Sequence, residues 1–499
     1  MRLINSLKNS VFMYVRLIFS AASSIIGISL LYRSLGNELF GYLSLIIASI
    51  AFVNFINIAL STTAQRFLAI STDDDYSNDG LNNLVNLNFV LTSVFLFIIL
   101  KLIGWTYLEK IFETSNAIKY LSKSFDILVI SACITNLHSV IIVRLVASEN
   151  FKLFAKVSVI DALVKLLITY VVYISPTFNI EEYSIGLLIN SIFILCIYTA
   201  NIKSVGRPII DTSIPSYKLI NKFFRFYFWT LFGSASSSIR IQGITLCLGA
   251  FFEAGVVSAR ALGNQAANSS RTLSQNLNVV LYPSILKGFN LKELDRWELL
   301  HTSCKLTYYL TFLIVCPVIF FSNDLLHIWL GSFTQQTKAF VSLMLIEVLI
   351  FSVSLPLTSV ARASERISEY ELRLGLSQFA LLPVSVFFLL MTNEPTSVLY
   401  CAIFTNIYMF WQRLIFLQKN MGLSLRNFNK NVLVPILKFT IPTILTIIII
   451  KGFKINLLFS SLVFFTLSLY IFYKVGLSVS ERTMIKSILK FDKITKNAA

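Results

Sequence analysis

The chain has 499 residues, of which 56% are hydrophobic and 13% are charged, and its formal net charge is +17. Soluble proteins carry about 25% charged residues, and apolar runs here repeatedly reach the roughly 17–25 residues that cross a bilayer. The composition therefore excludes an ordinary soluble protein and indicates an all-α, polytopic membrane protein. The cations lie in short loops between apolar runs and in the C-terminal tail, which is typical of membrane topology and argues against nucleic acid as a partner.

The first apolar run begins near Val11 and has no signal-peptidase site, so we expect it to be the first membrane helix. Hydropathy predicts six spans in the N-terminal part and seven more after a basic stretch at 203–225. The thirteen predicted spans are 11–32, 39–65, 84–104, 124–147, 154–175, 183–202, 226–252, 303–322, 338–360, 371–391, 396–418, 432–450 and 455–474. Hydropathy alone does not identify 255–285 as a further span.

The stretch 255–285 has a helical pattern of its own, with two arginines, several amides and no acid. At 100° per residue, one side of a helix holds Arg260, Asn264, Arg271, Gln275, Asn278 and Tyr282. Leu262, Ala266, Leu273, Leu277 and Val280 fall on the other side. From Arg260 to Tyr282 the helix is about 33 Å long, close to the thickness of the hydrocarbon core. A cationic stripe along a spanning helix predicts a wet passage for something anionic.

Charge bias supports this fourteenth span. If 255–285 crosses the membrane and the N-terminus is cytoplasmic, most loop lysines and arginines, together with the basic tail, fall on the cytoplasmic side. If it does not cross, every later loop changes sides, and the basic loops at 362–373 and 413–430 lie outside. The sequence therefore predicts 14 transmembrane helices with both termini inside. The alternative is an amphipathic helix on the membrane surface.

An internal repeat divides the predicted helices. The run Ser20-Ala21-Ala22-Ser23-Ser24 is matched by Ser234-Ala235-Ser236-Ser237-Ser238, and Gly41 is matched by Gly255, at one common offset. We expect two parallel six-helix bundles, a pattern that puts substrate near the midplane between repeats. The expected boundaries are a bundle at 1–202, a basic cytoplasmic linker at 203–225, a second bundle at 226–430, and two extra helices with a basic tail at 431–499.

Arginines inside predicted spans mark the expected substrate site. Insertion of an arginine into lipid costs about 2.5–3.5 kcal/mol, so an arginine is retained where it faces water, a partner or a ligand. Arg16 shares a helix face with Ser20, Ser23 and Gly27, and Asn57 lies on a polar stripe of the second helix. We expect the polar faces of the first, second, seventh and eighth helices to line a shared cationic cavity. Its candidate substrate-binding residues are Arg16, Arg240, Arg260, Arg271, Asn264, Gln275 and Asn57. Alternatively, Arg16 snorkels to the membrane edge, Arg240 pairs with an acid, and the small residues serve helix packing.

Three further residues are candidates for ion coupling. Asp161 and Lys165 stand at i and i+4 and can pair with each other. Glu347 lies in the middle of a predicted span with no cation within four residues, so it is either a proton or cation site or the partner of a residue on another helix. The cysteines and histidines lack metal-site spacing, and no phosphate-binding loop is present. We expect a transporter without metal or cofactor, not an enzyme.

Two motifs point to a family. Leu35-Gly36-Asn37-Glu38-Leu39-Phe40-Gly41-Tyr42 resembles the LG-x-E-x-FG-x-Y signature of polysaccharide exporters, and Val279-Val280-Leu281-Tyr282-Pro283-Ser284 resembles their V-x-YP-S element. The chain is similar over its whole length to the Wzx-type O-antigen flippases of the multidrug/oligosaccharidyl-lipid/polysaccharide superfamily. The fourteen predicted helices exceed the twelve that are usual in Wzx-type proteins, and in this number the chain is similar to the lipid II flippases. It lacks the arginine-rich start of the first helix that is typical of those flippases.

The resemblance implies a function. Wzx-type proteins move undecaprenyl-diphosphate-linked oligosaccharide repeat units from the cytoplasmic to the periplasmic leaflet of the bacterial inner membrane by alternating access. The expected partners are this lipid, the bilayer, H⁺ or Na⁺ as coupling ion, and polysaccharide polymerase and chain-length proteins. The alternatives are a multidrug/cation antiporter of the same superfamily, a lipid II-type flippase, and a non-transporting scaffold.

Overall fold

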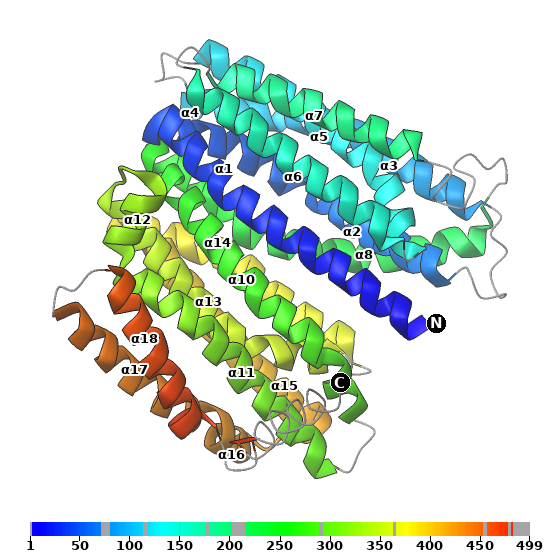
Figure 1. Cartoon of the computed structure of the whole chain (residues 1–499). Helices are drawn as coiled ribbons and strands as arrows, with labels where there is room; N and C mark the ends of the chain where they lie inside the picture. The colour runs from blue at the N-terminus through cyan, green and yellow to red at the C-terminus, as the bar shows by residue number, and fades with distance from the viewer. Residues whose placement is uncertain are drawn as a thin grey trace, which may run out of the picture. The chain divides into compact units, whose positions relative to one another are not determined.

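The apolar runs form α-helices in the computed structural model of the chain, which describes residues 2–70, 80–112, 118–148, 150–175, 179–201, 215–288, 293–362, 366–452, 457–477 and 481–482 (Figure 1). No strand occurs in these ranges. Ten helices there are long and apolar enough to cross a membrane. The chain is thus an all-α, multi-pass membrane protein, as the composition predicts.

The first nine helices cover the predicted spans up to residue 252. They are, with two π-helical turns, α1 (Arg2–Val53), α2 (Phe55–Ile70), α3 (Leu81–Ile99), η1 (Leu100–Gly104), α4 (Trp105–Phe112), α5 (Ile118–Ala147), α6 (Phe151–Ile174), α7 (Ile180–Ala200), α8 (Tyr217–Ser238), η3 (Ile239–Gly243) and α9 (Ile244–Phe251). Helix α1 contains the first predicted span and part of the second, and it consists of two helical segments joined at Gly36, whose backbone is not helical (φ 75°, ψ 178°).

The polar stretch 255–285 is helical throughout, as its periodicity predicts. It forms α10 (Ala254–Gly288), which is not among the ten apolar candidates. The remaining elements are α11 (Glu293–Phe320), α12 (Ser322–Leu330), α13 (Gln335–Arg362), α14 (Ile367–Thr392), α15 (Ser397–Met421), α16 (Leu425–Phe428), η4 (Asn429–Leu433), α17 (Val434–Gly452), α18 (Leu457–Ile471) and η5 (Phe472–Gly476). Among the residues that the structure describes, each predicted span falls on helix apart from a few terminal or kink residues. The count of 14 crossings, and the crossing of α10, stay predictions.

The chain divides into two compact units. Unit 1 consists of Met1–Gln265, Trp329–Thr337 and Gly375–Val398, and unit 2 consists of Ala266–Ile328, Lys338–Leu374 and Leu399–Ala499. In unit 1, α1 packs on α6, α5 on α7 and α2 on α8. A buried apolar cluster joins α2, α3, α5 and α8, with Phe89 and Phe223 fully enclosed.

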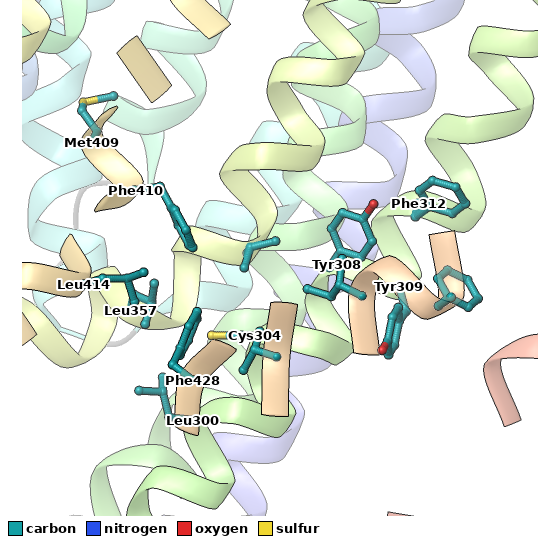
Figure 2. Packing of buried hydrophobic residues seen from close by; sticks show 14 of the residues in the cluster. Leu300, Cys304, Tyr308, Tyr309, Phe312, Leu357, Met409, Phe410, Leu414 and Phe428 are labelled. Atoms are coloured by element: carbon teal, nitrogen blue, oxygen red, sulfur yellow. The ribbon is translucent and has the colours of Figure 1, made fainter. Parts of the chain in front are cut away.

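The core of unit 2 is aromatic and includes the helices that the sequence assigned to a C-terminal addition. Tyr308, Tyr309 and Phe312 of α11 belong to this buried cluster (Figure 2), as do Phe439 of α17 and Phe464 of α18. The Tyr308 and Thr440 hydroxyls share a hydrogen bond of 2.9 Å, and the Tyr309 hydroxyl donates to the Gly476 carbonyl at 3.1 Å. Helices α17 and α18, which lie side by side (Figure 1), are therefore integral to the packing of unit 2.

Candidate functional site

Unit 1 contains a polar cavity of about 450 Å³ between α1, α6 and α7. Helix α1 contributes Arg16, Ser20, Ser23, Ser24 and Gly27 to its wall, which is the face that the helical wheel of the sequence predicts. Helix α6 contributes Asp161, Lys165 and Thr169, and α7 contributes Tyr183. The structure thus brings together three sequence candidates, Arg16, Asp161 and Lys165, that the sequence alone assigned to separate roles.

Small residues line the α1 side of this cavity. A β-carbon at Gly27 would lie 3.8 Å from the Thr169 hydroxyl oxygen, an ordinary contact distance, so α1 and α6 pack against each other there. The serines of α1 then supply hydroxyl groups to its wall without bulk. Both helices are long and apolar on their other faces, which fits a polar seam within membrane-spanning helices.

The charges of this cavity do not cancel. Lys165 Nζ donates to Asp161 Oδ2 at 2.8 Å, so the i, i+4 pair that the sequence suggests is formed. The guanidinium carbon of Arg16 lies 4.6 Å from the Phe154 ring centroid, a cation–π contact. The Nε of Arg16 is buried and has no hydrogen-bond partner among the described residues. The wall of the cavity therefore carries two cations and one anion.

Other candidates of unit 1 lie apart from this cavity wall. Arg260, on α10, is 3% exposed, and its Nε and Nη2 donate to the Thr245 hydroxyl and the Ile241 carbonyl, both at 3.4 Å. The Ile241 carbonyl is within the π-helical turn η3, where widened helical hydrogen bonding leaves room for an added donor. Asn57 is 8% exposed and accepts from the Ser61 hydroxyl at 3.3 Å.

Arg240 and Asn264 complete the unit 1 candidates. Arg240 lies in η3 and Asn264 in α10, and both are half-buried. The next residue, Gln265, donates to the Ser24 hydroxyl at 2.9 Å, which places the unit 1 part of α10 beside the serine run of α1.

Unit 2 contains the other candidates. Arg271 Nη2 lies 3.9 Å from Glu347 Oε1, and both side chains are largely buried. Asn406 Nδ2 donates to the same Glu347 oxygen at 2.8 Å, and the Arg271 guanidinium carbon lies 5.4 Å from the Phe351 ring centroid. Gln275 is exposed. Glu347 therefore has a cationic partner on another helix, which is the structural alternative that the sequence left open.

Several polar residues near these candidates had little signal in the sequence. Asn190 of α7 donates to Asp161 Oδ1 at 2.6 Å, and His138 of α5 lies in an adjoining cavity with Asp161. Each lies in an apolar span, where polar residues are often functional. Within the described ranges, no group of three or more His, Cys, Asp and Glu side chains is placed to hold a metal ion.

Comparison with known proteins defines the fold. No protein-family model and no curated protein matches the sequence. Among solved structures, the chain is similar to the lipid II flippase MurJ in an inward closed conformation, with a TM-score of 0.68, 14% identity, and coverage of 94% of this chain and 99% of that one.

Two multidrug transporters share this fold. The MATE multidrug transporter DinF-BH matches with a TM-score of 0.59, 14% identity, and coverage of 84% of this chain and 96% of that one. An outward-facing multidrug resistance MATE family transporter of the MOP superfamily matches with a TM-score of 0.53, 12% identity, and coverage of 80% and 95%. The chain has the fold of these transporters.

Proposed function

We propose that this protein is a flippase that moves undecaprenyl-diphosphate-linked oligosaccharide repeat units from the cytoplasmic to the periplasmic leaflet of a bacterial inner membrane, by alternating access. The observation that carries the proposal is the excess of cations over anions in the unit 1 cavity, whose wall holds Arg16 and Lys165 together with serine hydroxyls of α1. A diphosphate needs cationic partners and hydroxyl donors, and sugars need hydroxyl groups with which to exchange hydrogen bonds.

The charge balance favours this substrate over a cationic drug. A pump for cations needs an acid that is available to its substrate. Here Asp161 already accepts from Lys165 and Asn190, and Glu347 already lies beside Arg271. The sequence also predicts a polar stripe on α10, with Arg260, Asn264, Arg271 and Gln275, that contains no acid.

The test is transport by the purified protein in lipid vesicles. A fluorescent undecaprenyl-diphosphate-linked disaccharide is placed in the outer leaflet, and its loss of accessibility to a membrane-impermeant quencher measures flipping. Arg16→Gln is expected to slow flipping by roughly tenfold or more, since a charge-assisted contact to phosphate contributes about 1.5–3 kcal/mol. The matched control is Arg373→Gln, which removes an exposed arginine of α14 that pairs with Glu369.

Three outcomes would contradict the proposal. One is flipping by Arg16→Gln at the wild-type rate. Another is transport of a cationic dye with no movement of the lipid, which would favour the multidrug antiporter. The third is movement of a peptide-bearing lipid II analogue with no movement of the disaccharide lipid, which would favour the lipid II-type flippase.

A further inference from the structure

A second cavity of about 240 Å³ lies in unit 1 between α5, α6 and α7, and it adjoins the larger cavity. The two cavities share Ser158, Asp161 and Lys165 in their walls. The smaller cavity also has polar side chains of its own, which are Ser131, Thr135, His138, Asn190, Ser191 and Tyr198. Beyond the shared ion pair, no Asp, Glu, Lys or Arg is among the described residues of its wall, so this cavity suits a neutral ligand.

The serine and threonine hydroxyls of the smaller cavity already donate to the helix backbone. The Ser131 hydroxyl donates to the Leu187 carbonyl at 3.3 Å. The Thr135 hydroxyl donates to the Ser131 carbonyl at 2.9 Å. The Ser191 hydroxyl donates to the Leu188 carbonyl at 2.8 Å. A hydroxyl that gives its proton to the backbone keeps its oxygen lone pairs, so these three side chains are acceptors toward a ligand.

Two buried polar atoms of this wall have no hydrogen-bond partner among the described residues. They are Nδ1 of His138, which is 7% exposed, and Oδ1 of Asn190, which is 2% exposed. Asn190 donates through its Nδ2 to Asp161 Oδ1 at 2.6 Å, so its carbonyl oxygen remains as an acceptor. Buried polar atoms in folded proteins nearly always have a partner. Because both atoms belong to the wall of a cavity, a ligand that fills it can supply the missing hydrogen bonds.

An aromatic and aliphatic surface completes the wall. The ring centroids of His138 and Tyr198 are 5.7 Å apart, and Tyr198 is buried. Val157 and Ile194 add aliphatic groups. The volume of about 240 Å³ is below the roughly 300–1,000 Å³ of sites for drug-sized ligands, so the cavity suits one small ring and not a chain of rings.

These features select one class of ligand. A fully ionised anion such as sulfate cannot donate to the acceptors of the wall. A cation needs a carboxylate, but the Asp161 carboxylate already accepts from Lys165 at 2.8 Å and from Asn190. A neutral sugar ring meets both conditions, because each hydroxyl can donate and accept, and its C–H groups can lie against Tyr198. Such a hydroxyl can also pair with His138, whichever ring nitrogen carries the proton.

We propose that the smaller cavity is a subsite for one neutral sugar ring, with His138 and Asn190 as its hydrogen-bonding residues. The inference rests on the proposed function, to which it adds a place for the first sugar of the lipid-linked substrate. In that substrate the first sugar is bonded directly to the diphosphate, and in the structure the two cavities meet at Asp161 and Lys165. A diphosphate beside Arg16 and Lys165 in the larger cavity therefore brings its sugar to the smaller one.

The test compares the flipping of two lipids by the full-length protein in vesicles. One is the fluorescent undecaprenyl-diphosphate-linked disaccharide, and the other carries the same fluorophore on the diphosphate through an alkyl linker without sugar. The measured quantity is the ratio of the first flipping rate to the second. His138→Phe keeps an aromatic ring and removes both ring nitrogens, so it is expected to lower this ratio about fivefold, as the loss of a hydrogen bond to the sugar does. Ser131→Leu, which fills the smaller cavity from α5, is expected to lower it at least as much.

His301→Phe is the matched control. His301 of α11 is 6% exposed, its Nε2 has no hydrogen-bond partner among the described residues, and its ring centroid lies 5.7 Å from that of Phe428. It is similar to His138 in burial and in having an aromatic neighbour, but it lines neither cavity. The ratio is expected to keep its wild-type value in this variant. An unchanged ratio in both His138→Phe and Ser131→Leu would overturn the proposal and leave the smaller cavity as a site for water only.

A third variant covers the case in which the larger substitutions prevent folding, which size-exclusion chromatography detects. Thr135→Val keeps the volume of the side chain and removes one acceptor from the smaller cavity alone. It is expected to lower the ratio about threefold, which is a typical effect of one neutral hydrogen bond. In a protein that elutes as wild type does, an unchanged ratio in this variant would also overturn the subsite.

The subsite and the flippase can fail separately. Saturation-transfer difference NMR with the free disaccharide and the protein in lipid nanodiscs measures sugar binding without transport. A signal that is present in wild type and His301→Phe and is lost in His138→Phe, in a protein that flips neither lipid, supports the subsite and contradicts the proposed function. Flipping of both lipids at a ratio that none of the cavity variants changes overturns the subsite and leaves the proposed function standing.

Discussion

Gly41 and Gly255 lie at one helix crossing in unit 1, although they hold equivalent places in the two predicted copies. A β-carbon at Gly41 would overlap the backbone carbonyl of Ala254, and one at Gly255 would lie 2.6 Å from the Asn37 side-chain nitrogen. The second part of α1 and the beginning of α10 therefore approach to a distance that only glycine permits. The glycine of the LG-x-E-x-FG-x-Y signature has a packing role at this crossing.

This crossing predicts that Gly41→Ala lowers stability. The clash is with backbone atoms of Ala254, which cannot turn aside as a side chain does, so we expect a loss of about 1–3 kcal/mol. The matched control is Gly233→Ala in α8, where a β-carbon would meet nothing within 4 Å. It should gain about 0.5–1 kcal/mol from helix propensity. Unfolding in mixed SDS micelles measures both, and a Gly41→Ala protein as stable as wild type would contradict the packing role.

Much of the fold could be predicted from the sequence because membrane helices carry their own signal. Apolar length identified most spans, and the polar periodicity of 255–285 identified α10, which apolar length alone does not select. The break between the first two predicted spans is confirmed, because the backbone is non-helical at Gly36, although it takes one residue and not a loop. Helix α12 was missed, because it has nine residues and is too short to span.

The candidate site was predictable only within single helices. The face with Arg16, Ser20 and Ser23 and the pair Asp161–Lys165 follow from 3.6-residue periodicity. Their convergence on one cavity depends on the packing of α1 on α6, of which the sequence gives no local sign. Similarly, a search for cations near Glu347 along its own helix could not find Arg271 on α10.

The Arg271–Glu347 pair gives a second prediction. Because both groups are largely buried, Glu347→Ala leaves the arginine with an uncompensated charge and should cost about 3–5 kcal/mol. The double variant Arg271→Met with Glu347→Met removes both charges and should be considerably more stable than Glu347→Ala. A double-mutant cycle built from Arg271→Met, Glu347→Met and their combination, followed by SDS unfolding, measures the coupling. If the two single substitutions are additive, Arg271 does not serve as the partner of Glu347.

A third prediction concerns the pair of Lys305 and Glu481, whose side chains are 7% and 10% exposed. Glu481 accepts from Lys305 Nζ at 2.9 Å through one oxygen and from the Thr302 hydroxyl at 2.7 Å through the other. Glu481→Ala should cost about 3 kcal/mol or more, since it leaves a buried ammonium unpaired. Glu369→Ala, which breaks the exposed pair with Arg373, is the control and should cost less than about 0.5 kcal/mol. Thermal unfolding of the purified protein ranks the two, and equal melting temperatures would contradict a structural role for the tail residue.

A fourth prediction concerns Trp329, at the end of α12, which is held to α1 in unit 1. Its indole Nε1 donates to the Ile25 carbonyl at 3.0 Å, and its own carbonyl accepts from Arg33 at 3.0 Å and from the Ser29 hydroxyl. Trp329→Phe retains an aromatic ring and loses the indole donor, so we expect a loss of about 1 kcal/mol from that hydrogen bond, with a further cost from the smaller ring.

The same substitution at Trp411 of α15 is the control, because that ring is 42% exposed and belongs to no buried cluster of the described residues. Trp411→Phe should change the free energy of unfolding by less than about 0.5 kcal/mol. Adding Arg33→Gln to Trp329→Phe should then cost more than Trp329→Phe alone, since Arg33 reaches the backbone carbonyl of residue 329 whatever its side chain is. SDS unfolding of the three variants checks this order, and a Trp329→Phe protein no less stable than Trp411→Phe would show that the indole hydrogen bond does not hold the end of α12 to α1.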